Sequence, residues 1–223
     1  SGLSLNQITE DEDTFHIGAM CTLRQLETHP GLDACFGGYF SQALSPIVGV
    51  QFRNIATVGG SVYGRYGFSD VLTALLALDC EVETYPGGRM PLAAYLRKPY
   101  DRDILTQLIL HKDGRRAAYL SQRRTATDFP VLTCALSQST DEKWHIVLGA
   151  RPLRAMEIDN HLSPCPTREE ITRFAGELSP DLFGSNQRGS REYRHILAEV
   201  LLRRGIGQIV KEIKEEEGLS HAD

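Results

Sequence analysis

Apolar and polar positions follow two different periods in the first half of the chain. The run DVLTALLALD at residues 70–79 has apolar side chains at helical spacing, which predicts a buried helix with Asp70 as its N-cap. Thr22 and Gln25 stand three residues apart in a capping-box pattern, which predicts another short helix. Residues 81–85 alternate like a strand with one wet face, and the PGG that follows predicts a turn.

The second half opens with strand patterns. Residues 104–110 form an apolar, strand-like run, and Asp113-Gly114 then predicts a hairpin whose return strand covers 117–121. A further hairpin is expected from the runs at 131–137 and 144–148. The chain therefore contains helices and antiparallel strands together, and the fold class predicted is α+β.

Helical patterns complete the chain. Thr167 stands three residues before Glu170, and apolar residues at helical spacing follow this capping pair. Ser190 is expected to cap a last helix that ends near Gly205, and the tail KEIKEEEGLSHAD at 211–223 is expected to be solvated and frayed. The change from the mixed first half to a small sheet plus helices predicts two domains, 1–111 and 112–223.

Composition narrows the class of protein. The chain has 223 residues, 41% of them hydrophobic and 24% charged, which excludes disordered and coiled-coil proteins. A net charge of −5 argues against a nucleic-acid-binding protein, and no apolar run has the length of a membrane span. The five cysteines are widely spaced with no C-x-x-C pair, so neither a disulfide framework nor a protein-held metal site is expected. The same cysteine usage predicts a cytoplasmic location.

The most informative segment for function is QFRNIATVGGSVYGRYGFSD at 51–70. Gly59 and Gly60 would let the backbone approach a ligand and could present N–H groups to an anion, and Thr57 and Ser61 add hydroxyls. Residues 47–61 are expected to be mostly loop. The spacing of the glycines matches neither a Rossmann nor a P-loop motif, so on the pattern alone an ordinary surface loop is the favoured interpretation.

This segment resembles the second flavin loop in the FAD-binding subunit of the molybdenum hydroxylases, a family that includes xanthine dehydrogenase and CO dehydrogenase. Residues 52–61 of this chain follow the family pattern I-R-N-x-x-T-I-G-G-N. In the family, this pattern is followed by an Asp and an L-L-A-L-D-like helix, and Asp70 and residues 75–79 match them here. Further segments resemble family motifs in the same order: HIGAMCTLRQLETHP at 16–30, DILT at 103–106, RRTATDFPV at 123–131 and GSREYR at 189–194.

The resemblance implies a fold, a cofactor and a set of binding residues. The fold implied is a vanillyl-alcohol-oxidase-type FAD-binding domain followed by the C-terminal domain of CO dehydrogenase flavoproteins. The cofactor implied is FAD, and no catalytic residue or metal ligand is carried over. The positions that match FAD-facing positions of the family are Ile47, Gly49, Thr57, Val58, Gly59, Gly60, Ser61, Asp70 and Leu105. Alternatively, the Asp70 carboxylate could simply cap its helix.

The partners implied are a subunit with [2Fe–2S] clusters and a subunit with the molybdenum cofactor. Electrons would pass from the clusters through FAD to NAD or to another acceptor. Because the flavin carries the chemistry, this role needs no metal ligand in the chain itself.

Three features depart from the family pattern. Ser61 stands where Asn is usual, and Leu120 stands where many members have Lys near the flavin. The family's earlier flavin loop, an A-G-G-T-like stretch, has no counterpart, so the flavin domain is expected to be incomplete and FAD binding by this chain alone to be weak or absent. Two alternatives follow: a flavin-less scaffold subunit of the same complex, or a stand-alone flavin reductase such as UDP-N-acetylenolpyruvylglucosamine reductase.

Other candidates have ordinary structural explanations. The seven histidines form no recognisable catalytic group and are expected to be structural or surface residues. The arginine pairs, such as Arg123 with Arg124, are expected on a solvated face, with docking to an acidic partner as the alternative. The aromatic residues Tyr63, Tyr66 and Phe68 could cover a flavin or could anchor the loop by packing.

Overall fold

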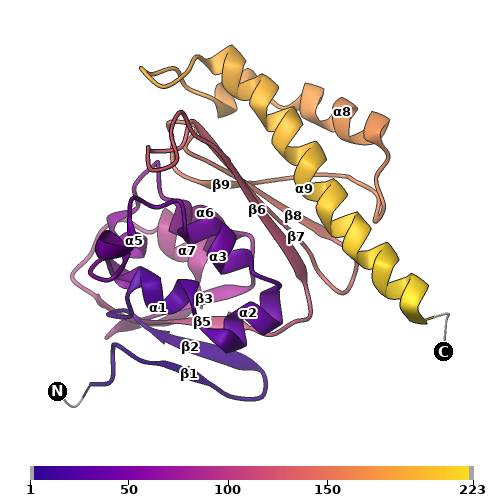
Figure 1. The fold of residues 1–223 in the computed structure, drawn as a ribbon. Coiled ribbons are helices and arrows are strands. Elements are labelled where there is room, and N and C mark those ends of the chain that lie inside the picture. The colour runs from indigo at the N-terminus through magenta and orange to yellow at the C-terminus, as the bar shows by residue number, and fades with distance from the viewer. Residues whose placement is uncertain (1–2, 221–223) are drawn as a thin grey trace.

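The computed structural model describes residues 3–220 and contains two antiparallel sheets (Figure 1). The first sheet has five strands in the order β1-β2-β5-β3-β4. Its strands are β1 (Ile8–Glu10), β2 (Thr14–Gly18), β3 (Cys80–Tyr85), β4 (Gly88–Pro91) and β5 (Ile104–His111). One face of this sheet is covered by seven short helices, α1 (Leu23–Glu27), α2 (Pro30–Phe36), α3 (Tyr39–Leu44), α4 (Val50–Arg53), α5 (Val58–Gly64), α6 (Asp70–Leu76) and α7 (Leu92–Arg97).

The second sheet has four strands in the order β6-β7-β8-β9. They are β6 (Arg116–Gln122), β7 (Leu132–Gln138), β8 (Trp144–Gly149) and β9 (Met156–Ile158). The helices α8 (Arg168–Glu177) and α9 (Arg191–Ser220), with the short 3-10 helix η1 (Pro180–Leu182) between them, follow in the chain. The α+β class expected from the sequence is confirmed.

The hairpin predicted at Asp113-Gly114 is wrong. Strand β5 pairs with β2 and β3 in the first sheet, whereas β6 pairs with β7 in the second. The two residues instead lie in the connection between the sheets, and the Asp113 carboxylate accepts hydrogen bonds from Arg115 at 2.8 and 2.9 Å. A turn-forming sequence therefore marks the place where the chain leaves one sheet for the other, close to the predicted boundary at 111/112. The division into two domains stays a prediction.

The last helix is longer than predicted. It begins after Ser190, whose hydroxyl accepts from the N–H of Tyr193 at 3.1 Å, as a cap should. However, it continues through Gly205 to Ser220, so the predicted end at Gly205 is wrong. A Cβ at position 205 would lie 2.2 Å from a methyl group of Leu136 and 2.7 Å from one of Leu120. Gly205 therefore permits close packing of the helix on the sheet and does not end the helix.

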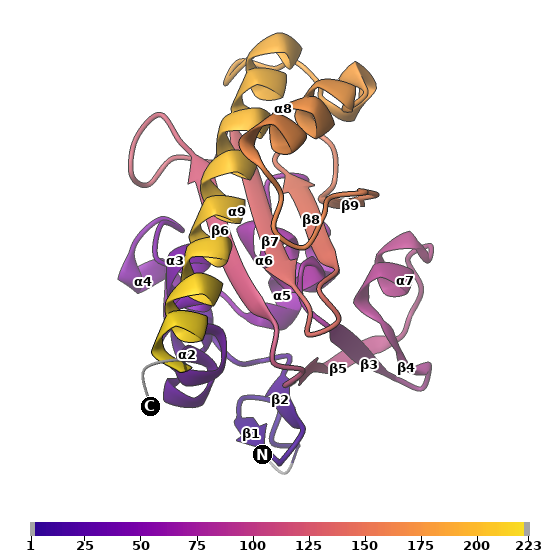
Figure 2. The same ribbon diagram turned by 90° about the vertical axis from the view of Figure 1, so that its right-hand side faces the viewer.

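Strand β7 lies at the centre of the molecule, with all its residues buried. Cys134 and Leu136 face α8 and α9, whereas Ala135 belongs to the core shared with the first half. Figures 1 and 2 show α9 crossing the second sheet on the side opposite α3 and α6. The hydroxyls of Thr73 and Thr133 are 3.1 Å apart, and they join α6 to β7. Helices of both halves thus cover the second sheet.

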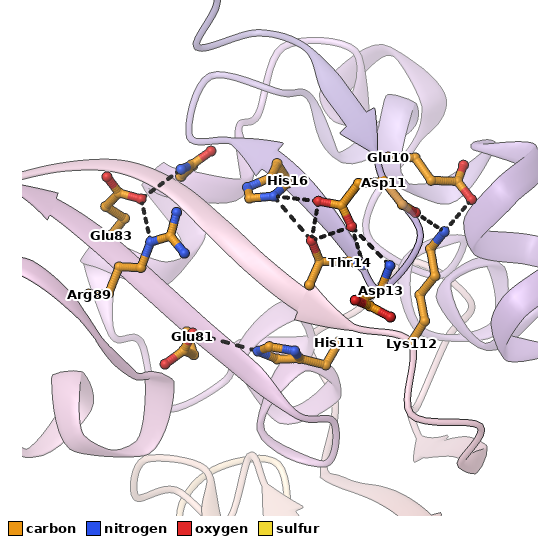
Figure 3. Close-up of polar contacts among 11 residues, drawn as sticks. Glu10, Asp11, Asp13, Thr14, His16, Glu81, Glu83, Arg89, His111 and Lys112 are labelled. Atoms are coloured by element: carbon orange, nitrogen blue, oxygen red, sulfur yellow. Dashed lines mark hydrogen bonds and ion pairs between the residues drawn. The ribbon is translucent and has the colours of Figure 1, made fainter.

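The other face of the first sheet is polar (Figure 3). Asp11 and Thr14 surround the ring of His16, and Glu83 accepts from Gln107 at 2.7 Å and from Arg89 at 3.0 Å. Alternation along the strands sends apolar side chains to the helices and polar ones to this face. Its histidines have local partners, as expected for structural residues.

Candidate functional site

The glycine-rich segment is a helix start and not a loop. Thr57 is the N-cap of α5, and its hydroxyl accepts from the N–H of Gly60 at 3.1 Å. With α4 also present, the expectation that 47–61 is mostly loop is wrong. Two adjacent glycines made the segment look irregular, but the N-cap threonine sets the helix start and tertiary contacts hold the helix.

The first N–H groups of α5 already have acceptors in the protein. The N–H of Val58 donates to the carbonyl of Cys21 at 2.8 Å, and that of Gly59 donates to the carbonyl of Ala19 at 2.8 Å. Gly59 lies so close to this segment that a Cβ would be 2.6 Å from the Ala19 oxygen. Close packing therefore explains the glycine at position 59. The N–H groups of Val58 and Gly59, which were expected to be able to bind an anion, are bonded to carbonyls of the protein instead.

A pocket of about 530 Å³ opens on one side of the α5 N-terminus. Five of the predicted FAD-facing residues line it: Ile47, Thr57, Gly60, Ser61 and Asp70. Exposed aromatic rings form another wall, because Phe68 stacks on Tyr66 with ring centroids 5.3 Å apart and contacts Phe129 at 4.4 Å. The pocket is thus lined by aromatic rings as well as by hydroxyl-bearing side chains, which suits a planar ring system.

A second pocket of about 470 Å³ lies next to the first. It is lined by Gly59 and Leu105 of the predicted set and shares Thr57 and Gly60 with the first pocket. The exposed guanidinium of Arg102 also lines it. The first turn of α5 thus separates two hollows, and a long ligand could contact both across Thr57 and Gly60.

Two predicted residues line neither pocket. Val58 is fully buried in the core, and Gly49 is the N-cap of α4, next to Val48 in the pocket wall. Both can therefore act on a ligand only by supporting their neighbours. Their assignment as FAD-facing positions stays a prediction, like that of the other seven residues.

Asp70 is not the N-cap predicted from the sequence. The cap is Ser69, whose hydroxyl accepts from the N–H of Leu72 at 3.1 Å. Asp70 is buried instead, and its Oδ1 accepts from the hydroxyl of Tyr119 at 2.6 Å and from the guanidinium of Arg123. Burial raises the pKa of the Asp70 carboxyl, and the charge of Arg123 opposes that rise.

Arg123 also lines the first pocket, and the sequence prediction placed it wrongly. It was expected on a solvated or docking face, but its side chain is buried and its guanidinium also donates to the carbonyl of Asp128 at 2.6 Å. It therefore holds the 123–129 segment, including Phe129, against the pocket. The family motif at 123–131 was the signal that could have identified it.

The residues present fit parts of FAD. The aromatic wall and Ile47 suit a flat ring system, and the hydroxyls of Thr57 and Ser61 with Arg102 could bind ribityl and phosphate oxygens. Within residues 3–220, His, Cys, Asp and Glu side chains form no group of three or more that could hold a metal ion. Every helix in the same range is too short or too polar to cross a bilayer.

The fold is α+β with two adjoining pockets beside α5, and comparison with known proteins identifies its family. Residues 1–112 match the model of the FAD binding domain in molybdopterin dehydrogenase. The chain therefore belongs to this family, and it is an oxidoreductase subunit whose family cofactor is FAD. The resemblance stated from the sequence is confirmed.

Relatives and solved structures are similar to this chain along much of its length. Over 203 residues the chain is 27% identical to the protein YgfM of Escherichia coli K12, covering 90% of this chain and 74% of YgfM. It is 33% identical over 152 residues to the nicotinate dehydrogenase FAD-subunit of Eubacterium barkeri, covering 62% of this chain and 51% of that one. Reconstituted CO dehydrogenase from Oligotropha carboxidovorans has the same fold, with a TM-score of 0.79, 20% identity, and coverage of 93% of this chain and 79% of that one.

Proposed function

We propose that this chain is the FAD-binding electron-transfer subunit of a cytoplasmic molybdenum hydroxylase. Its partners are a [2Fe–2S] subunit and a molybdenum-cofactor subunit, and NAD or another small molecule is the final acceptor. When bound, FAD supplies the ability to accept electrons from one-electron carriers and to pass them on in pairs. One observation carries the proposal: seven residues predicted from the flavin-loop resemblance line two adjoining pockets.

The chain's own residues bind and orient the cofactor in this proposal. Phe68 and Phe129 provide apolar ring faces, while Thr57 and Ser61 provide hydroxyls at the α5 N-terminus. The buried pair of Asp70 and Arg123 holds the start of α6 against the segment after β6, and both residues line the pocket. These groups set the position and the electrostatic field of the cofactor, which is what a protein contributes to flavin chemistry.

The proposal is tested by mixing the purified chain with FAD and measuring visible flavin absorbance in the protein peak after gel filtration. We expect weak retention by this chain and stronger retention when a segment with the family's first flavin loop is supplied. Thr57→Val should reduce retention, because it removes the hydroxyl shared by both pockets. Thr172 is an exposed threonine on α8, so Thr172→Val is the matched control and should leave FAD retention unchanged. Absence of retained flavin even with the added segment would overturn the proposal.

The second candidate is a flavin-less scaffold subunit of the same kind of complex. One observation favours it: the first N–H groups of α5 donate to Cys21 and Ala19 of the protein, so they offer nothing to a pyrophosphate. Under this hypothesis the chain would copurify with molybdenum and [2Fe–2S] subunits and contain no flavin. Flavin in the purified complex at one equivalent per chain would exclude it.

A further inference from the structure

A third cavity, of about 350 Å³, lies at the junction of the two halves, away from both flavin pockets. It is bordered by α6 and α7 of the first half and by the segment joining β8 to β9 in the second, and Figure 2 shows α7 beneath β9 there. Leu72 and Leu76 of α6 line it, but no residue that lines either flavin pocket does. It is therefore a separate site.

Arg151 supplies a buried positive charge to this cavity. The residue is only 7% exposed, and its guanidinium donates to the carbonyls of Arg154 at 2.8 Å and Leu182 at 2.7 Å. The remaining nitrogen, Nη2, has only the sulfur of Met156 at 3.8 Å. No carboxylate pairs with Arg151 in the part of the chain that the structure describes. Burial lowers the pKa of this guanidinium, but arginine keeps its charge in proteins.

Two more arginines line the same cavity. Arg97 lies in the last turn of α7 and is exposed, and among residues 3–220 its guanidinium has neither a hydrogen-bond nor an ion-pair partner. Arg154 donates only to the carbonyl of Leu96, at 3.3 Å. One carboxylate, Glu157, also lines the cavity, but it already pairs with His145 at 2.8 Å. The cavity thus has three guanidiniums without a carboxylate of their own.

The remaining wall is apolar. Leu72, Leu76 and Leu96 line it together with Ala93, Ala155 and Met156. A hydrated inorganic anion would leave this apolar surface in contact with water, whereas a ligand with an apolar body would remove the surface from water. One buried and two exposed arginines beside an apolar wall are complementary to a small amphipathic anion.

We propose that this cavity binds a small organic carboxylate, with its carboxylate among Arg97, Arg151 and Arg154 and its apolar body against Leu72, Leu76 and Leu96. Paired guanidinium donors suit a carboxylate because they form charge-assisted hydrogen bonds with both of its oxygens. Such a ligand contacts both halves of the molecule. Its binding therefore stabilises their packing at a place that the cofactor does not touch.

The experiment is a titration of the full chain with hexanoate, in which binding is measured by isothermal titration calorimetry and by ligand-observed NMR. Acetate tests the need for an apolar body, hexanol the need for charge, and inorganic phosphate the binding of any anion. We expect saturable binding of hexanoate, binding at least about tenfold weaker for acetate and phosphate, and none for hexanol. The titration is repeated with FAD present, and we expect hexanoate affinity to stay the same.

Variants locate the site. Arg97→Gln and Arg154→Gln should each weaken hexanoate binding about tenfold or more, because each removes one charge-assisted partner. Both side chains are exposed, so these variants should fold even if Arg151→Gln does not. Arg204→Gln, an exposed arginine on α9, is the matched control and should bind as the unchanged protein does. Hexanoate binding that is absent, or insensitive to Arg97→Gln and Arg154→Gln, overturns the proposal whether or not the chain retains FAD.

Discussion

The guanidinium of Arg123 donates to Oδ1 of Asp70 and joins the first turn of α6 to the segment that follows β6. The same oxygen accepts from the hydroxyl of Tyr119 on β6 at 2.6 Å. Both ends of the ion pair line the larger of the two pockets beside α5. The pair therefore fixes the relative position of two pocket walls that come from different halves of the chain.

Breaking this pair should destabilise the protein strongly. We expect Asp70→Asn to lower the free energy of unfolding by about 3–5 kcal/mol, because it leaves Arg123 buried without a counter-charge. Urea denaturation followed by circular dichroism measures the change. Asp181→Asn is the control: its side chain is 89% exposed and pairs with Arg191 at 3.4 Å, so the effect should be much smaller. Equal effects of the two substitutions would contradict a structural role for the buried pair.

The same substitution at two helical glycines should have opposite effects. At Gly59 a Cβ would lie 2.6 Å from the Ala19 carbonyl oxygen, so Gly59→Ala should cost about 1–3 kcal/mol of stability. At Gly207 in α9 nothing lies within 4 Å of a Cβ, so Gly207→Ala should add about 0.5–1 kcal/mol. Thermal or urea unfolding of both variants measures these changes. A stabilising Gly59→Ala would show that α5 does not pack on Ala19.

Asp11 should titrate at unusually low pH. Hydrogen bonds from the Thr14 hydroxyl, and then from the N–H groups of Thr14 and Asp13, lower its pKa from the ordinary 3.8 to about 2. A depressed carboxyl pKa stabilises the fold above the unfolded value, and this contribution is lost as the pH falls from about 3.8 to about 2. Thr14→Val should therefore raise the Asp11 pKa in a carboxyl NMR titration.

The control for that titration is Asp141, whose pKa of about 2 has a different cause. Lys143 and then Ser139 lower it, and neither contacts Thr14. Thr14→Val should leave the Asp141 pKa unchanged. If Asp11 also titrates as in the unchanged protein, the hydroxyl contact shown in Figure 3 is not the main cause of its low pKa.

Ser61 offers a test of the flavin pocket from the opposite direction. The family pattern has Asn at this position, and a longer amide side chain has more polar atoms to reach a ligand. On the proposed function, Ser61→Asn should strengthen FAD binding about 3- to 10-fold, measured by quenching of flavin fluorescence. Ser61→Ala is the control and should not strengthen binding. An unchanged affinity in Ser61→Asn would argue that Ser61 does not face the cofactor.

Several elements could be predicted because their signals are local. The capping box of Thr22 and Gln25 forms as expected, since both partners lie within one turn. Strand β3 and the turn after it follow from alternation and the PGG signal, and the hairpin of β7 and β8 follows from two strand patterns with a short turn. The helix at 70–76 follows from apolar spacing, although its N-cap is Ser69 and it ends at Leu76, before the end of the predicted run at Asp79.

The sequence by itself determined several elements, such as the capped helices at 23–27 and 168–177 and the hairpin of β7 and β8, and, through ordered motifs, the family to which the chain belongs. The tertiary structure alone decided that β5 pairs with β2 and β3 and not with β6, and that Asp70 faces Arg123. It also decided that the N–H groups of α5 are bonded within the protein and that three arginines surround one cavity. The physical reason is that periodicity and capping act over a few residues, whereas strand partners, buried ion pairs and cavities depend on contacts between residues far apart in the chain.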